Sequence, residues 1–189
     1  LANTAKYDFP LEFYQKGILM IGGSTHLQYN GMYYEGDLSG ITTGNIPFWF
    51  QHFYKPGRRI SKAPDWETKL QEIVKKAPDW DIGIIVGVPA WIQILLEKII
   101  KNYNLKTIHD IWPNLSAYVH SGVSFSPYIK SFEKLFNRPI IYSESYLASE
   151  GYIAFQNPHS VNSMEMLLNN GLFFEFVPFN GSNFDGDGN

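Results

Sequence analysis

The 189-residue sequence contains no cysteine, which excludes disulfide bonds and thiolate metal sites. It also lacks an excess of positive charge. Its 15 Lys and Arg residues against 18 Asp and Glu residues give a net charge of −3, so no nucleic-acid-binding surface is expected. No apolar run approaches the roughly 20 residues of a membrane-spanning helix, and the first residues do not resemble a signal peptide. With disulfides absent, we expect a cytoplasmic protein that binds neither nucleic acid nor membranes.

The composition is that of a folded protein. Hydrophobic residues make up 44% of the chain and aromatic residues 16%, enough for a sizeable core. Residues 180–189 consist mainly of Gly, Asn, Asp and Ser, a composition typical of linkers. We therefore predict a folded unit over residues 1–179 and a flexible tail over residues 180–189.

Apolar runs and helical stripes alternate along the chain. We predict strands over residues 17–21, 82–86, 115–119, 139–142 and 151–155. Helices are predicted over residues 65–76 and 89–103, and a third helix is expected to begin at Ser126-Pro127. The segment 166–177 favours a β-hairpin that turns on Asn170-Gly171. Continuously apolar strands between helices indicate an α/β fold with a largely parallel sheet, flanking helices and a C-terminal β-hairpin.

Three turns follow predicted strands, over residues 87–91, 121–124 and 146–151. Ligands of parallel α/β sheets bind beyond the carboxyl ends of the strands, so these turns are the candidate site. Glycine in such a turn lets a flat ligand approach the backbone. The Ser149 hydroxyl and the Glu150 carboxylate suit a phosphate oxygen and Mg²⁺.

The order and content of these segments resemble the auxin-responsive acyl-acid amido synthetases, a branch of the adenylate-forming superfamily that includes firefly luciferase. The resemblance extends from Gly17 to Pro178. It is most specific in H-S-G-V-S-F-S-P-Y (120–128), Y-L-A-S-E-G-Y (146–152) and N-G-L-F-F-E-F-V-P (170–178). Further matching segments are G-I-L-M-I-G-G-S (17–24), D-L-S-G-I-T-T-G-N-I-P (37–47), G-V-P-A-W (87–91) and I-W-P-N-L (111–115). The chain would then be part of the N-terminal adenylation domain.

The resemblance implies a two-step ligase. ATP and a carboxylic acid give an acyl-adenylate, and an amine such as an amino acid then takes the acyl group; ATP and Mg²⁺ are the implied cofactors. The implied nucleotide-binding residues are Gly122, Val123, Ser124, Tyr146 and Ser149. Glu150 would be the catalytic, Mg²⁺-associated carboxylate, and the acyl pocket would be lined by Val88, Pro89 and Trp91. No contact is assigned to Phe174 or Glu175.

Plainer interpretations stay open for several of these residues. Tyr146 is also compatible with a core aromatic residue, and Glu150 with a cap on the following segment. His120, just before the glycine turn, suits either a catalytic role or a strand-end histidine with satisfied hydrogen bonds. The other histidines show no metal-ligand spacing, so no histidine metal site is predicted.

The sequence also leaves the function of the whole protein open at several points. The superfamily's phosphate-binding loop, ribose-binding aspartate and C-terminal domain are not found here, and Ser39–Gly44 only imitates the first. We therefore expect a central fragment that alone neither adenylates nor binds ATP tightly. A thioester-forming ligase of the same superfamily, or a non-catalytic module with the same fold, are the alternatives. The acid, the amine and the oligomeric state are not predicted.

Overall fold

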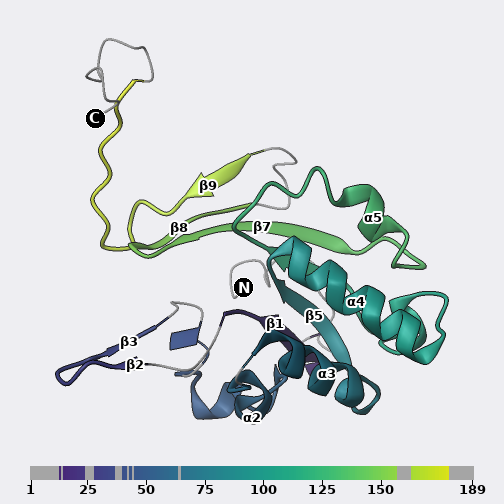
Figure 1. Cartoon of the computed structure of the whole chain (residues 1–189). Helices are drawn as coiled ribbons and strands as arrows, with labels where there is room; N and C mark the ends of the chain where they lie inside the picture. Colours follow the sequence, from purple (N-terminus) through teal and green to yellow (C-terminus); the bar gives the residue numbers. More distant parts are fainter. Residues whose placement is uncertain are drawn as a thin grey trace.

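The computed structural model of the chain describes residues 13, 15–23, 28–36, 40–41, 43, 45–63, 65–156 and 163–178. Its centre is a seven-stranded sheet with the strand order β4-β1-β5-β6-β7-β8-β9 (Figure 1). The first five strands in this order run parallel, and β8 and β9 run antiparallel to their neighbours. The predicted tail over residues 180–189 and half of Ser39–Gly44 lie outside the described residues.

The elements of the sheet and its helical layer follow one another along the chain. In order, they are β1 (Gly17–Ile21), β4 (Tyr54–Lys55), α2 (Arg58–Ser61), α3 (Trp66–Lys76), β5 (Ile82–Gly87), α4 (Pro89–Tyr103), β6 (Ala117–His120), α5 (Ile129–Glu133), β7 (Ile141–Ala148), β8 (Gly151–Gln156) and β9 (Met164–Met166). A separate two-stranded hairpin joins β2 (Gln28–Tyr29) to β3 (Tyr34–Glu35). In the part of the chain that the structure describes, short 3-10 helices cover Phe48–Phe50, Ala77–Asp79 and Ile108–Asp110.

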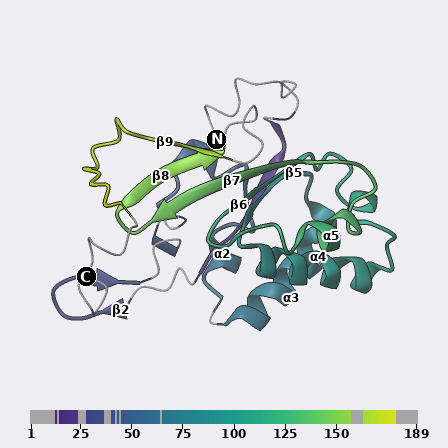
Figure 2. The same ribbon diagram turned by 90° about the horizontal axis from the view of Figure 1, so that it is seen from above.

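Helices α2 to α5 lie on one face of the sheet (Figures 1 and 2). The main core is formed where this layer meets the sheet. Leu19, Ile85 and Tyr118 point from the strands into it, and Ile73 and Leu96 meet them from α3 and α4, all fully buried. Burying such side chains contributes roughly 1.5–3 kcal/mol each, so this layer holds most of the hydrophobic stabilisation.

Local sequence explains the two long helices. The Asp65 carboxylate accepts a hydrogen bond from the Thr68 backbone N–H at 2.8 Å and caps α3. Pro89 occupies the first turn of α4, where its missing N–H costs nothing, and Asn104 ends the helix in the left-handed conformation. The predicted bounds of α4 are confirmed.

The opposite face of the sheet carries a smaller cluster of Phe13, Ile84 and Ala117. Ile18, Val86 and Val119 pack against it and are only partly buried. Strand residues alternate between the two faces, so this cluster and the main core arise from neighbouring positions of the same strands.

The C-terminal strands differ in detail from the prediction. An antiparallel hairpin is present, but β8 and β9 form it, with the pair Phe155 and Glu165 in register. Asn170-Gly171 does make a turn, with Gly171 at φ +83°, yet residues 172–178 form no strand. The Asn170 amide donates instead to the Tyr152 carbonyl at 2.6 Å, which docks the turn on β8.

Two further boundaries are corrected. The third strand begins at Ala117 rather than Leu115, which is buried just before it. Helix α5 begins at Ile129, because Ser126 and Pro127 lie in a turn closed by the Tyr128 N–H and the Phe125 carbonyl at 2.8 Å. The α/β class with a largely parallel sheet is confirmed. Within the described residues, no helix combines the length and apolarity needed to cross a membrane.

Candidate active site

Two of the three predicted turns meet at one edge of the sheet, and the third lies on the strand that continues past this edge. Gly87 at the end of β5 is in register with His120 at the end of β6, which is in register with Glu144 of β7. The three strands are parallel, so the residues after Gly87 and His120 emerge at the same edge. We call this edge, comprising residues 87–91, 120–124 and 144–150, the rim.

The middle of the rim is the turn 121–124. Gly122 has φ +89°, a left-handed conformation that a side chain disfavours, and Gly122, Val123 and Ser124 are exposed. A methyl group added at Gly122 would meet Val88 Cγ2 at 3.7 Å. The predicted adenine turn and the predicted acyl wall are thus in direct proximity, with an accessible backbone between them and solvent.

The predicted acyl wall divides between two environments. Val88 is the N-cap of α4 and faces the glycine turn, whereas Pro89 is buried at the start of the helix. The Trp91 ring lies 5.5 Å from that of Trp66 on α3, and 38% of the residue is exposed. Trp91 therefore covers the helical layer beside the rim.

Strand β7 extends four residues beyond Glu144 before it turns into β8. At a rise of about 3.3 Å per residue, its last residue lies roughly 13 Å past the register position of His120. Tyr146 stands on this extension and is 51% exposed, so it is not a core aromatic residue. Ser149 and Glu150 form the exposed turn at its tip. A strand follows Glu150, so it does not cap a helix.

His120 is the residue whose environment the sequence did not reveal. It is 3% exposed and stacks on Phe125 with ring centroids 4.5 Å apart. Burial lowers its pKa to about 4, so the imidazole is neutral at pH 7. Its Nδ1 atom is buried without a hydrogen-bond partner among the described residues, unlike the satisfied strand-end histidine considered from sequence. Its only sequence signal was its place before the glycine turn.

Tyr118 connects the core to the rim. Its hydroxyl donates to the Gly87 carbonyl at 3.0 Å, and its ring stacks on Phe132 at 5.1 Å. Burial raises the pKa of the Tyr118 hydroxyl far above its usual range, so it remains a donor at any physiological pH. The end of β5 is therefore anchored through a buried hydrogen bond. The Ser145 hydroxyl similarly donates to the His120 carbonyl at 3.4 Å and joins β7 to β6.

The rim offers several features that suit a nucleotide base and one carboxylate that suits a metal ion. The accessible backbone around Gly122 and the exposed Tyr146 ring suit a flat base. Among the described residues, no group of three or more His, Asp or Glu side chains could hold a metal ion. Mg²⁺ is commonly bound through one or two carboxylates together with substrate phosphates, and the exposed Glu150 carboxylate fits that pattern.

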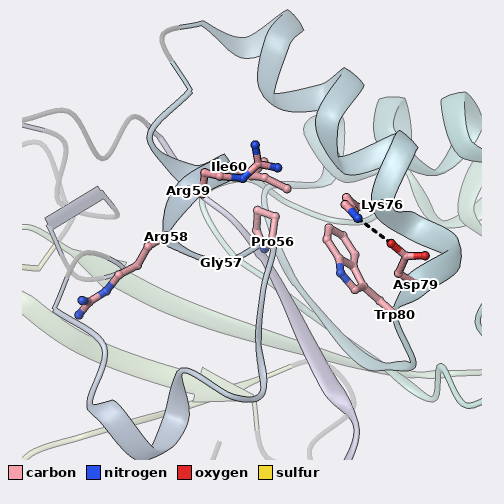
Figure 3. A pocket seen from close by; sticks show the side chains of 8 residues that line it. All are labelled: Pro56, Gly57, Arg58, Arg59, Ile60, Lys76, Asp79 and Trp80. Carbon is pink, nitrogen blue, oxygen red and sulfur yellow. Dashed lines mark hydrogen bonds and ion pairs between the residues drawn. The ribbon is translucent and has the colours of Figure 1, made fainter.

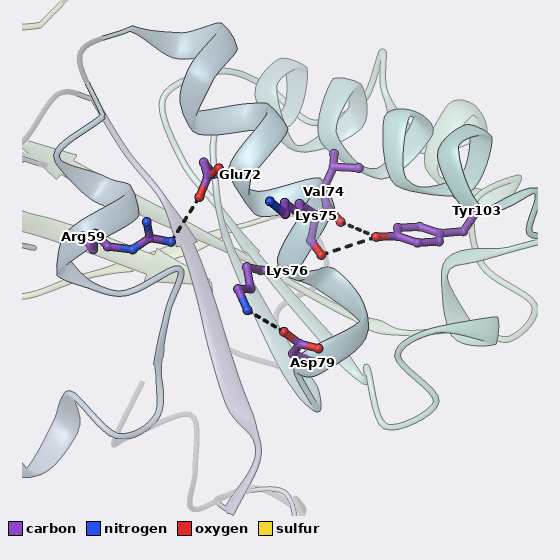
Figure 4. Close-up of polar contacts among 7 residues, drawn as sticks. All are labelled: Arg59, Glu72, Val74, Lys75, Lys76, Asp79 and Tyr103. Carbon is purple, nitrogen blue, oxygen red and sulfur yellow. Dashed lines mark hydrogen bonds and ion pairs between the residues drawn. The ribbon is translucent and has the colours of Figure 1, made fainter.

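A pocket of about 360 Å³ lies away from the rim, between the turn after β4, helix α2 and the end of α3 (Figure 3). Trp80, one of its walls, precedes the amino end of β5, whereas the rim is at the carboxyl end. Ion pairs Arg59–Glu72 at 3.1 Å and Lys76–Asp79 at 2.9 Å stand beside it (Figure 4). None of the predicted site residues lines this pocket.

Comparison with known protein families matches residues 18–140 to the GH3 family N-terminal domain. The match covers more than half of the chain and includes all of β1 but its first residue, the helical layer, and the rim segments 87–91 and 120–124. A search of curated proteins found none that matches the chain. Members of the matched family are acid–amino acid ligases. The chain therefore belongs to the GH3 family, the family of auxin-responsive acyl-acid amido synthetases.

Proposed function

We propose that the protein to which this chain belongs joins a carboxylic acid to an amine, such as an amino acid, by way of an acyl-adenylate. The observation that supports this most is the register Gly87–His120–Glu144. It brings the segments that resemble the family's acyl wall and adenine turn to one edge, next to the strand that carries the Ser-Glu element roughly 13 Å further along. A tight turn at one strand end is common, but three such segments at one rim suit a shared ligand.

In the first step, a carboxylate oxygen of the acid attacks the α-phosphorus of ATP. A P–O bond forms, the bond between the α-phosphorus and the bridging oxygen breaks, and pyrophosphate leaves. In the second step, the amine nitrogen attacks the acyl carbon, a C–N bond forms, AMP leaves and the nitrogen loses a proton. Adenylation is needed because a free carboxylate is a poor electrophile with no good leaving group.

Each rim segment has a part in this scheme. The backbone of Gly122, Val123 and Ser124 lines one side of the adenine, and the exposed Tyr146 ring packs on the other. The Ser149 hydroxyl would donate to an α-phosphate oxygen, and Glu150 would hold Mg²⁺. Bound Mg²⁺ would neutralise charge on the phosphates.

The acyl group occupies the space beside α4. Val88 and Pro89 line it where the helix begins, and the exposed part of Trp91 borders it. The Val88 side chain lies next to the glycine turn, so the acid and the nucleotide lie side by side, as the attack on the α-phosphorus requires.

The test is acid-dependent exchange of radiolabelled pyrophosphate into ATP, with a panel of carboxylic acids and protein from the complete reading frame. We expect at least one acid to support exchange, and Glu150→Gln to lower it on the order of 100-fold. Glu133→Gln, the same change on the exposed surface of α5, is the matched control and should leave exchange unaltered.

The outcomes separate the alternatives. Normal exchange in Glu150→Gln removes Glu150 from its role. If no acid of the panel supports exchange, adenylation is contradicted and a non-catalytic module is favoured. Exchange followed by transfer to a thiol but to no amine identifies the thioester-forming alternative.

A further inference from the structure

His120 has an environment that packing alone does not explain. Its side chain lies on the same face of β6 as Tyr118, which is the face that carries the main core. It is also the last residue of the strand before the exposed turn. Rings surround it, with Phe125 at 4.5 Å and Tyr118 at 5.5 Å. A phenylalanine would fill such a place without bringing polar atoms into it.

The Nδ1 atom of His120 is buried and makes no hydrogen bond with the described part of the chain. Leaving a polar atom buried and unpaired costs about 1–3 kcal/mol. His109, the other buried histidine of the described residues, shows the usual arrangement. Its Nε2 atom bonds the Leu115 carbonyl at 3.0 Å, and its Nδ1 atom accepts from the Asn137 N–H at 3.2 Å. The protein satisfies one buried imidazole fully and leaves the other incomplete at the rim.

The position of His120 indicates which ligand could complete it. Across the sheet it is in register with Gly87, which leads directly into Val88. Gly122 follows two residues after His120, and a Cβ atom added there would meet Val88 Cγ2 at 3.7 Å. The imidazole therefore stands where the proposed acyl wall meets the proposed adenine turn. In the reaction above, this junction is where the carboxylate of the acid meets the α-phosphate.

We propose that His120 is a substrate-binding residue whose Nδ1 atom forms a hydrogen bond with a carboxylate oxygen of the acid. This rests on the proposed function. A neutral imidazole can donate one N–H, and carboxylate oxygens are strong acceptors. Because Nδ1 is covered in the free chain, binding requires an outward shift of the adjacent turn. Three of the four residues of that turn, Gly122, Val123 and Ser124, are exposed.

Three variants of the complete protein test this. His120→Phe keeps the ring and removes both nitrogens. His120→Asn keeps a hydrogen-bonding group near the position of Nδ1. His109→Phe is the matched control, because it makes the same change at a buried histidine with both nitrogens bonded. For each, we would measure the KM for the acid and for ATP in pyrophosphate exchange, and the melting temperature.

We expect His120→Phe to raise the KM for the acid on the order of 10- to 100-fold. Its KM for ATP should stay within about twofold, and its melting temperature should equal or exceed that of the wild type. His120→Asn should recover most of the acid affinity. His109→Phe should melt lower and keep its KM for the acid, since it loses two hydrogen bonds far from the ligand.

Two results would overturn the proposal on its own. One is that His120→Phe supports exchange at the wild-type rate and with an unchanged KM for the acid. The other is a lowered melting temperature with both KM values shifted alike, which describes a structural residue. If no acid supports exchange in the wild type, the proposed function fails and this inference fails with it. If the wild type does exchange and only the His120 results disagree, the inference alone fails, so the two failures are distinguishable.

Discussion

Replacing Gly87 by alanine should destabilise the protein more than the same change at Gly122. A Cβ atom at Gly87 would lie 2.9 Å from the Ile21 carbonyl oxygen and 3.0 Å from Ile92 Cδ1. The Ile92 side chain can turn aside, but the carbonyl belongs to the neighbouring strand β1 and cannot move without disturbing the sheet. Overpacking of this kind costs about 1–3 kcal/mol, and with the displaced strand we expect about 2–3 kcal/mol.

Gly122 provides the contrast, because space is not the limit there. Its methyl group would make an ordinary contact with Val88 at 3.7 Å, so the cost is the left-handed backbone, about 1 kcal/mol. For a chain of this size, 1 kcal/mol shifts the melting temperature by about 2–4 °C. We therefore expect losses of about 4–12 °C for Gly87→Ala and about 2–4 °C for Gly122→Ala. Equal melting temperatures in differential scanning calorimetry would refute the close approach of β1 to the rim.

Two further predictions concern polar contacts that support the sheet. Tyr118→Phe removes the hydrogen bond to the Gly87 carbonyl and should cost about 1 kcal/mol in urea unfolding; an unchanged midpoint would contradict this anchor. The Asp81 carboxylate accepts hydrogen bonds from Lys16 at 2.6 Å and Asn114 at 2.9 Å. The hydrogen bond from Lys16 is the main reason why the pKa of this carboxyl group lies below its usual value. A lowered pKa adds stability above the unfolded value that is lost as the pH falls through the folded value. Asp81→Asn should therefore be less stable than the wild type at pH 7, and the gap should shrink below about pH 4. A stability difference between the two proteins that stays constant with pH would contradict a stabilising role of the ionised carboxylate.

Local sequence signals predicted the long elements well. Helix α4 combines a first-turn proline, a continuous apolar stripe and a left-handed end, so its bounds could be predicted from Pro89 to Tyr103. Strand β5 is buried on both faces over its first four residues, whereas β1 is buried on one face and partly buried on the other; both appear as uninterrupted apolar runs. These features depend on neighbours along the chain, which a single sequence contains.

Features that depend on distant partners were missed. Strand β7 continues past Tyr142 because Ser143 and Glu144 pair with β6 and residues 145–148 pair with β8, and no apolar run marks that stretch. The Asn170-Gly171 turn has hairpin chemistry, but its side chain bonds to β8 instead of closing a new strand pair.

The candidate site shows the same limit. Sequence order was enough to place the turns after strands β5 and β6, and parallel pairing then brings them to one edge. The unsatisfied Nδ1 atom of His120 could not be predicted, because its burial depends on how Phe125 packs over the ring.

The most direct test of the account is to label the nucleotide site itself. The protein from the complete reading frame would be irradiated with an azido-adenine analogue of ATP, with excess ATP as the competition control, and the labelled peptides sequenced by mass spectrometry. We predict competed labels within residues 120–128 and 141–152, the two segments that flank the proposed adenine position. Competed labels confined to other parts of the chain, such as the pocket beside Trp80, would contradict it.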